Sequence, residues 1–304
     1  MTLQQPGDCF SVAVIVVNWN LAGETAACID SVQSGSLLPL RIFVVDNGST
    51  DDSAERLRQR FGADISLIQS PQNLGFAGGN NVGIRAALAQ GIEWVFLVNN
   101  DTVVAADCLA QLRQATTALP TFRLWGPLIL YHDEPERIWA LGDRALAGTL
   151  ITRGVLRNAV APAALPAIEP VDYLTACGLL VHREVFEGIG LLDESFFMYA
   201  EDADFCRRAQ AAGFRLACAT RARMWHKVSR STGVHHPASR YWRTANQIRF
   251  YRRYSHGLER LMLWLFTVIR LAGLSLRDLL HGRWSLLEPT WRAWVRGWFG
   301  SQPV

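Results

Sequence analysis

The sequence predicts an α/β protein with a doubly wound, mostly parallel sheet, followed by a C-terminal helical segment that is basic and rich in tryptophan. Short apolar runs of strand length alternate with helical patterns along residues 12–130, as expected when parallel strands are buried on both faces. The composition changes after residue 240. Residues 241–304 carry ten arginines against three carboxylates, a balance of +7, and six of the eleven tryptophans.

Four strands are predicted in the first hundred residues, and a helical pattern follows each one. Strands alternating with helices at this spacing favour parallel pairing and right-handed crossovers. The expected strands cover residues 12–18, 41–45, 65–68 and 94–98. The helical patterns run through Ile29 and Val32, through Leu57 and Phe61, through Ile84 and Leu88, and through Leu109 and Leu112.

The pattern after residue 124 is less regular. We expect a strand over residues 124–130 and short hairpins over residues 131–171, where prolines and glycines are frequent, with a mobile loop at residues 159–169. A strand-like run then covers residues 173–181, and a short strand is expected at residues 214–217.

Composition and cysteine usage limit the class of protein. Half of the 304 residues are hydrophobic, which argues against disorder, and the six cysteines are dispersed without a C-x-x-C pair. This pattern favours free thiols in a reducing compartment over a disulfide framework or a zinc knuckle. The start lacks a basic n-region, and the apolar run over residues 12–17 is too short for a signal peptide or a membrane span. We therefore expect a cytoplasmic protein.

Polar side chains follow three of the predicted strands at the point where each ends. Asn18 and Asn20 follow the first strand, Asp46 ends the second, and Asn-Asn-Asp at residues 99–101 follows the fourth. Ligands of doubly wound sheets bind beyond the carboxyl ends of the strands. The three strand ends therefore outline one site.

A glycine- and asparagine-rich segment, NLGFAGGNN at residues 73–81, is predicted to be a loop that opens a helix. It is not G-x-G-x-x-G and follows the third strand, which argues against a nicotinamide cofactor, and it lacks the Lys-Ser/Thr of a P-loop. One interpretation is a loop with helix caps. The other is that Gly75, Gly78 and Gly79 let the backbone approach a nucleotide, with the helix N-terminus facing its diphosphate.

The segment Asn99-Asn100-Asp101 is a candidate seat for Mg²⁺ or Mn²⁺, because these ions take oxygen ligands, few from protein and the rest from water and phosphate. His226 would add a nitrogen ligand, which suits Mn²⁺ better than Mg²⁺. Taken alone, His226 is better explained as an ordinary surface or core histidine than as a metal ligand.

Five carboxylates cluster within residues 190–208, around the apolar residues 196–199. Glu201 and Asp202 stand where a helical pattern begins, so the helix dipole favours an ionised acid there. A helix cap is the simple explanation. Large aromatic side chains just before two adjacent acids indicate instead a partly desolvated carboxylate, which is how a general base is made.

Within this cluster we select Asp202 as the base. Asp204 lies two residues further along the helix and faces another direction, where it is placed to pair with Arg207 or Arg208. Glu201 is expected just outside the helix, where it would orient an acceptor.

Taken together, these segments resemble the family 2 glycosyltransferases, inverting enzymes with the GT-A fold. The resemblance covers roughly residues 10–230. Within the family, the sequence looks most like the rhamnosyltransferase-like branch, because it combines the segments Asn-Asn-Asp-Thr and Phe-Phe-Met-Tyr-Ala-Glu-Asp-Ala-Asp. The matching segments, in chain order, are VVNWN ending at Asn20, VVDNGSTD around Asp46, NLGFAGGN from Asn73, NNDT from Asn99, DESFF from Asp193, EDAD from Glu201 with Arg207, and Trp225-His226.

The resemblance implies a role for each residue on the donor side. Asp46 would read a pyrimidine base with Asn18 and Asn20 nearby, and Asn73 and Gly78 would line the nucleoside.

The resemblance also implies a metal site and a catalytic pair. Asn99 replaces the first aspartate of the usual D-x-D and stands with Asn100 on the donor side, which leaves Asp101 and His226 as metal ligands. Asp202 would be the catalytic base, and Glu201 an acceptor-side partner. The Gln-x-x-Arg-Trp motif of processive polymer synthases is absent, which points to a single transfer.

Residues 241–304 form the second expected unit, after a catalytic domain over residues 1–240. Their apolar stretch is interrupted by Arg270 and is too short for a comfortable membrane span. Trp and Arg interleaved over residues 284–298 suit a membrane interface. The alternative is a helical pair packed on the core or on another subunit. The leucine and tryptophan content argues against a nucleic-acid partner.

The sequence as a whole predicts a metal-dependent inverting glycosyltransferase on the inner face of the cell membrane. Its donor would be a nucleotide sugar, with dTDP-rhamnose the first choice, and its acceptor a glycan or lipid-linked glycan of cell-surface polysaccharide assembly. The alternatives are a sugar nucleotidyltransferase and a non-catalytic glycan-binding or scaffold protein. Whether the chain forms a homo-oligomer is left open.

Overall fold

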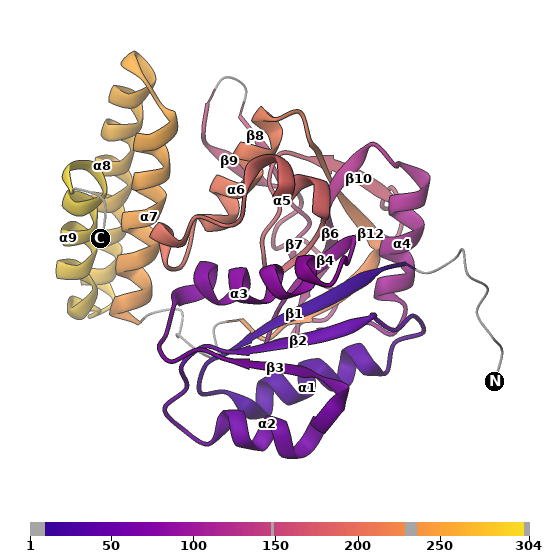
Figure 1. The fold of residues 1–304 in the computed structure, drawn as a ribbon. Coiled ribbons are helices and arrows are strands. Elements are labelled where there is room, and N and C mark those ends of the chain that lie inside the picture. The colour runs from indigo at the N-terminus through magenta and orange to yellow at the C-terminus, as the bar shows by residue number, and fades with distance from the viewer. Residues whose placement is uncertain (1–9, 147–148, 229–235, 301–304) are drawn as a thin grey trace, which may run out of the picture.

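The computed structural model describes residues 10–146, 149–228 and 236–300 (Figure 1). Ten strands of the described residues form one mixed sheet. These strands are β1 (Val12–Asn18), β2 (Arg41–Asp46), β3 (Ser66–Gln69), β4 (Trp94–Asn99), β5 (Thr102–Val104), β6 (Phe122–Tyr131), β7 (Ile138–Ala140), β10 (Ile168–Val171), β11 (Gly178–His182) and β12 (Arg215–His226). A separate antiparallel pair consists of β8 (Asp143–Ala145) and β9 (Thr152–Gly154).

The strand order is β10-β12-β6-β11-β4-β1-β2-β3, with β5 beside β12 and β7 beside β6. Strands β3, β2, β1 and β4 are parallel, so their carboxyl ends share one edge. In register, Asn18 lies opposite Asp46, and Val17 lies opposite Asn99. The predicted doubly wound, mostly parallel sheet is confirmed.

Helices cover both faces of the sheet, because alternate residues of each strand point to opposite sides. One layer consists of α1 (Ala22–Gln33), α2 (Ser53–Phe61) and α4 (Cys108–Ala118). The other consists of α3 (Gly75–Ala89), α5 (Arg183–Ile189) and α6 (Glu201–Ala211). Val14 of β1 belongs to the core under the first layer together with Ile29, whereas its neighbour Ile15 belongs to the core under the second together with Ile84.

Strand β12 differs from the predicted short strand at residues 214–217. It runs for twelve residues, with a register shift between Ala219 and Arg223, because it pairs along its length with β6 and at its end with β5. The pairing with β5 places His226 opposite Thr102. The strand therefore extends as far as the edge where β4 ends.

Three other boundaries also differ from the predictions. The expected loop over residues 73–81 is helical from Gly75 onward. In the expected strand over residues 173–181, only Gly178 and the residues after it pair as a strand, since Tyr173 forms an isolated bridge with Asp143. The expected loop at residues 159–169 ends in strand β10, which begins at Ile168. Five of the six cysteines are buried free thiols, and Cys9 lies outside the described residues.

The C-terminal segment is helical, as predicted, and consists of α7 (Pro237–Tyr254), α8 (Gly257–Leu280) and α9 (Leu287–Phe299). The three helices stand together at the side of the body toward which β1 runs (Figure 1). Their core includes Ile248 of α7, Leu263 of α8 and Trp298 of α9, and it reaches Phe196 of the body. Across the described ranges, no helix combines the length and the apolar character that a membrane span requires. The described residues also include three short 3-10 helices, η1 (Gly62–Asp64), η2 (Glu194–Phe196) and η3 (Trp284–Leu286).

Candidate active site

The ends of β1 and β2 form a buried polar pair. Asn18 Nδ2 donates to Asp46 Oδ1 over 2.8 Å, and Ser49 Oγ donates to the same oxygen over 2.5 Å. Asn20, which has a positive φ of 55°, accepts a hydrogen bond from the Thr50 amide through its Oδ1 over 2.8 Å. Asn18, Asn20 and Asp46 thus lie together, and Asn20 holds the loop that follows β2.

Asn73 lies next to this pair through Asn47, whereas Gly78 lies in the first turn of α3 and faces Leu74 and Glu194. Asn47 Nδ2 donates to Asn73 Oδ1 over 3.2 Å, and Asn73 Oδ1 also accepts from the Gly75 amide over 2.8 Å. A Cβ at position 78 would come within 2.7 Å of the Leu74 side chain, so close packing within the helix requires glycine there.

The first amides of α3 have a protein partner. The Phe76 and Ala77 amides donate to the Phe197 carbonyl over 2.6 and 3.4 Å. A Cβ on Gly75, where φ is +74°, would lie only 2.3 Å from that carbonyl oxygen. Glycine at position 75 therefore admits the loop over residues 193–199 to the helix N-terminus, where one of the two interpretations of this segment places a diphosphate.

Asp101 and His226 meet at the end of β4. Asp101 Oδ1 and His226 Nε2 are 3.1 Å apart, and both side chains are buried. The register of β5 with β12 brings them together, and the Lys227 amide donates to the Asp101 carbonyl over 2.9 Å. Trp139 packs edge-on against the His226 ring, with the centroids 4.4 Å apart.

The donor atoms at this edge fit a divalent ion. Asp101 and His226 contact each other directly at 3.1 Å, and carboxylate oxygen and imidazole nitrogen are ligand types of such ions. Asn99 Oδ1 is buried without a hydrogen-bond partner. The described residues contain no group of three His, Cys, Asp or Glu side chains arranged for a metal, so an ion here would take its other ligands from water and phosphate. Asn100 Nδ2 donates to Thr25 Oγ1 over 3.1 Å, which fixes the turn after β4.

Asp202 lies in the first turn of α6 and is held by the segment that precedes β11. Tyr173 Oη donates to Asp202 Oδ2 over 2.7 Å, and the Ala176 amide donates to the same oxygen over 3.3 Å. Burial raises the pKa of the Asp202 carboxyl above its ordinary value, whereas these hydrogen bonds lower the pKa and so limit the rise. A carboxylate whose pKa lies closer to neutral is a better general base.

Glu201 is the first residue of α6, not a residue outside the helix as expected. Its side chain is buried, and Oε2 has no hydrogen-bond partner. Burial, together with the neighbouring Asp202 charge, raises the pKa of Glu201 well above its usual range. Glu201 is therefore neutral over a wider pH range than an exposed glutamate.

Two hydrogen bonds connect the carboxylate at Asp202 to the end of β4. Asp202 accepts from the Ala176 amide, and the next carbonyl, of Cys177, accepts from the Asn99 amide over 3.0 Å. Since Asn99 precedes Asp101 by two residues, the candidate base and the candidate metal ligands share one edge of the sheet.

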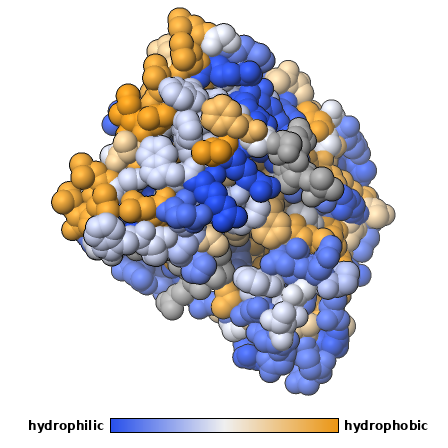
Figure 2. Space-filling view, turned by 90° about the vertical axis from the view of Figure 1, so that its left-hand side faces the viewer, coloured by the Kyte–Doolittle hydropathy of each residue, from blue (hydrophilic) through white to orange (hydrophobic). Residues whose placement is uncertain are grey.

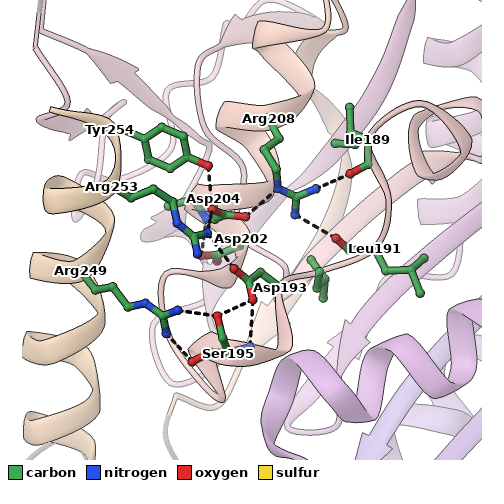
Figure 3. A network of polar contacts seen from close by, with 12 residues as sticks. Ile189, Leu191, Asp193, Ser195, Asp202, Asp204, Arg208, Arg249, Arg253 and Tyr254 are labelled. Carbon is green, nitrogen blue, oxygen red and sulfur yellow. Dashed lines mark hydrogen bonds and ion pairs between the residues drawn. The ribbon is translucent and has the colours of Figure 1, made fainter. Parts of the chain in front are cut away.

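A second set of contacts ties α6 to the C-terminal segment (Figure 3). Asp204 pairs with Arg208 at 2.7 Å, which confirms one of the two predicted partners. Asp204 also pairs with Arg253 of α7 at 2.6 Å, and Arg253 reaches Asp193 at 2.7 Å. Tyr254 Oη donates to Asp204 Oδ1 over 2.7 Å.

Helix α7 also holds the loop between Asp193 and α6. Arg249 donates to the Ser195 carbonyl over 2.6 Å (Figure 3), and Asn246 Nδ2 donates to the Met198 carbonyl over 2.8 Å. The sequence analysis missed Tyr173, Asn246, Arg249 and Arg253. No spacing signal marks them, because each acts across 29 or more residues of sequence.

Family models match most of the chain. A model of glycosyl transferase family 2 matches residues 13–141, and a model of glycosyl transferase family group 2 matches residues 94–298. The chain is 28% identical over 241 residues to the N-acetylglucosaminyl-diphospho-decaprenol L-rhamnosyltransferase of Mycobacterium tuberculosis, covering 72% of this chain and 77% of that protein. It is 34% identical over 204 residues to the low-salt glycan biosynthesis hexosyltransferase Agl10 of Haloferax volcanii, covering 66% and 61%. Galactofuranosyltransferase GlfT1 of M. tuberculosis is 28% identical over 209 residues, covering 67% and 66%.

Two solved structures share the fold. The structure of GalNAc-T7 with UDP, GalNAc and Mn²⁺ superposes with a TM-score of 0.60 at 14% identity, covering 81% of this chain and 50% of that one. The mannosyltransferase PcManGT of Pyrobaculum calidifontis, in complex with GDP-Man and Mn²⁺, gives 0.57 at 16% identity, covering 95% and 87%. The sheet, its helical layers and the polar edge thus define a GT-A glycosyltransferase fold. The chain belongs to glycosyltransferase family 2.

Proposed function

We propose that this protein transfers one sugar, with inversion, from a nucleotide-sugar donor to a hydroxyl group of a glycan or lipid-linked acceptor in cell-surface polysaccharide assembly. The observation that carries the proposal is the carboxylate of Asp202, held by Tyr173 and the Ala176 amide, at the same sheet edge as the Asp101–His226 pair. A displacement at an anomeric carbon needs a base that accepts the proton of the attacking hydroxyl. It also gains from a divalent ion that stabilises the leaving diphosphate, and candidates for both lie at this edge.

In the proposed reaction Asp202 accepts the proton of the acceptor hydroxyl. The acceptor oxygen forms its bond to the anomeric carbon while the bond from that carbon to the phosphate oxygen breaks, and the electron pair leaves with the nucleoside diphosphate. Glu201 lies on the acceptor side. Asp101 and His226 would hold a divalent ion, Mg²⁺ or Mn²⁺, which would supply positive charge for the departing diphosphate.

The donor side is built from the ends of the parallel strands. Asp46, fixed by Asn18 and by the loop that Asn20 holds, would read the base. The other proposed donor contacts come from the turn before α3 and the end of β4, at Asn73, Gly78, Asn99 and Asn100.

The relatives support a choice of first substrates. One is named for transfer of L-rhamnose to a diphospho-decaprenol-linked N-acetylglucosamine. We therefore propose dTDP-rhamnose as the first donor and a diphospholipid-linked sugar as the first acceptor. The galactofuranosyltransferase relative makes the galactofuranose donor the second choice.

The test incubates the full chain with a panel of UDP-, GDP- and dTDP-sugars, with Mg²⁺, Mn²⁺ or EDTA, and measures release of nucleoside diphosphate. We expect release from one donor, dependent on the metal and lost in Asp202→Asn, and NMR of the product should show an inverted anomeric centre. Turnover of none of the donors in the panel, or a product of retained configuration, would contradict the proposal. Release of pyrophosphate from a nucleoside triphosphate with a sugar phosphate would support the nucleotidyltransferase alternative.

A further inference from the structure

Helix α8 has one buried and one exposed apolar face. Leu263, Thr267, Leu271 and Ser275 recur every four residues and are buried, so this face packs on its neighbours. The opposite face is apolar and exposed over the whole length of the helix. Its members are Leu258, Leu261, Met262, Leu265, Phe266, Ile269, Leu276 and Leu280, and the exposed fractions of Leu258, Ile269 and Leu280 are 72%, 71% and 77%. We call these eight residues the α8 face.

Of the four tryptophans that we expected at a membrane surface, Trp284 is 67% exposed, whereas the other three turn inward. The indole N–H groups of Trp294 and Trp298 both donate to Thr267 Oγ1 over 3.1 Å, and that of Trp291 donates to Ser275 Oγ over 3.1 Å. These three side chains therefore turn inward and hold α8 against α9. These three tryptophans pack inside the C-terminal segment, and the aliphatic side chains of the α8 face remain exposed.

The charges around the α8 face have one sign. Of the exposed charged residues of α8, Arg270 and Arg277 flank the α8 face, whereas Arg260 lies three residues before the buried Leu263 and donates to the Ser255 carbonyl on the packed side. Asp278 is buried against Arg240 at 3.2 Å, and Glu259 is half-buried. An exposed apolar stripe flanked by arginines complements an anionic lipid surface, because the side chains enter the acyl region while the guanidinium groups meet the headgroups.

A second copy of the chain fits this surface less well. Two α8 faces packed on each other would bring the arginines of both copies into one interface, and like charges in contact are unfavourable. No helix in the described part of the chain can span a bilayer, so α8 would lie in the plane of the membrane surface.

The position of the α8 face also suits lipid contact. Helix α8 forms part of the outer side of the C-terminal segment (Figure 1), and Figure 2, which faces this side, shows hydrophobic side chains gathered over its upper part. Between α8 and the body stands α7, whose Arg249 and Arg253 bind the loop before α6. A membrane bound by the α8 face would therefore lie on the side of the protein toward which β1 runs, and the candidate active site lies at that end of the parallel strands.

We propose that the α8 face docks the protein onto an anionic lipid bilayer, such as the cytoplasmic leaflet of the cell membrane. The inference goes beyond the transfer reaction and does not depend on it, because docking requires neither donor nor acceptor. The aliphatic side chains provide the affinity, and the flanking Arg270 and Arg277 provide the preference for anionic lipid.

The experiment measures co-sedimentation of the full chain with vesicles of phosphatidylglycerol and phosphatidylcholine, and with phosphatidylcholine alone, without any nucleotide sugar. We expect binding to the anionic vesicles that weakens as NaCl rises, because salt screens the arginines. The double variant Leu261→Gln/Ile269→Gln should reduce the partition by about tenfold or more, because two side chains no longer enter the acyl region. Thermal unfolding of each variant verifies that it is folded.

A matched control removes two leucines of comparable exposure from another surface. Leu38 and Leu40, between α1 and β2, are 60% and 55% exposed, and Leu38→Gln/Leu40→Gln should bind like the wild type. The proposal is overturned if the wild type does not bind the anionic vesicles, or if both double variants bind equally. It is also overturned if light scattering shows a wild-type dimer that Leu261→Gln/Ile269→Gln converts to monomer while no form binds vesicles, since a second copy would then cover the face. None of these outcomes bears on nucleotide-sugar turnover, which is measured separately.

Discussion

The phenol of Tyr173 donates a hydrogen bond over 2.7 Å to Oδ2 of Asp202, a residue 29 positions further along the chain. This bond fixes the carboxylate at the start of α6 and stabilises its ionised form. Burial raises the pKa of Asp202, and the Tyr173 hydrogen bond lowers it, so the tyrosine keeps the carboxylate ionised down to a lower pH. Tyr173 is thus a positioning residue for the proposed base.

Replacing Tyr173 with Phe should move the acid limb of the pH–kcat profile to higher pH. The lost hydrogen bond had lowered the pKa of Asp202, so the pKa rises further, and a base is active only above its pKa. Tyr251→Phe is the control, because its hydroxyl contacts Gln247 and no carboxylate. Identical acid limbs in Tyr173→Phe and the wild type would show that Tyr173 does not lower the pKa of the catalytic base.

Replacing Asp202 with Asn should cost on the order of 10²-fold or more in kcat, with donor binding nearly unchanged, since asparagine keeps the shape but cannot accept the proton. Glu201→Gln should instead raise the KM for the acceptor. Steady-state kinetics and donor titration by calorimetry separate the two effects. Near wild-type turnover by Asp202→Asn would assign the base to another carboxylate.

Replacing Asp101 with Ala should abolish turnover at all practical metal concentrations, because Asp101 supplies the carboxylate of the proposed metal site beside His226. Asp64→Ala removes an exposed carboxylate at the opposite end of the sheet, before β3, and should leave turnover unchanged. Activity is measured with added Mn²⁺ and after EDTA. Full activity of the wild type in EDTA would refute the metal role.

Replacing Arg253 with Gln should lower the free energy of unfolding by about 1–3 kcal/mol, since the buried carboxylate of Asp204 loses one of its charged partners. Arg292→Gln breaks an exposed pair with Glu288 and should cost ~0–1 kcal/mol. Urea unfolding of both variants measures the difference. Equal losses would mean that the contacts of α7 with α6 contribute no more than a surface ion pair.

The sequence alone determined the features that depend on local pattern. Continuous apolar runs such as Val12 to Val16 predicted strands buried on both faces, and the polar residues after them predicted a shared edge, because parallel strands end on the same side. Asn18, Asp46 and Asp101 lie at that edge in the structure. The family followed from the order of the motifs, and the family models confirm it.

Only the tertiary structure decided which distant residues meet. The contact of Tyr173 with Asp202, and that of Arg253 with Asp204 and Asp193, depend on how β11, α6 and α7 pack, and packing leaves no periodic signal in sequence. The same reason explains why Trp291, Trp294 and Trp298 do not lie at the exposed surface where we predicted them. Helical spacing shows that Trp294 and Trp298 share a face with other apolar residues, but which apolar face is buried depends on the partner helix. Here Thr267 of α8 accepts their indole N–H groups, and the aliphatic side of α8 is left exposed.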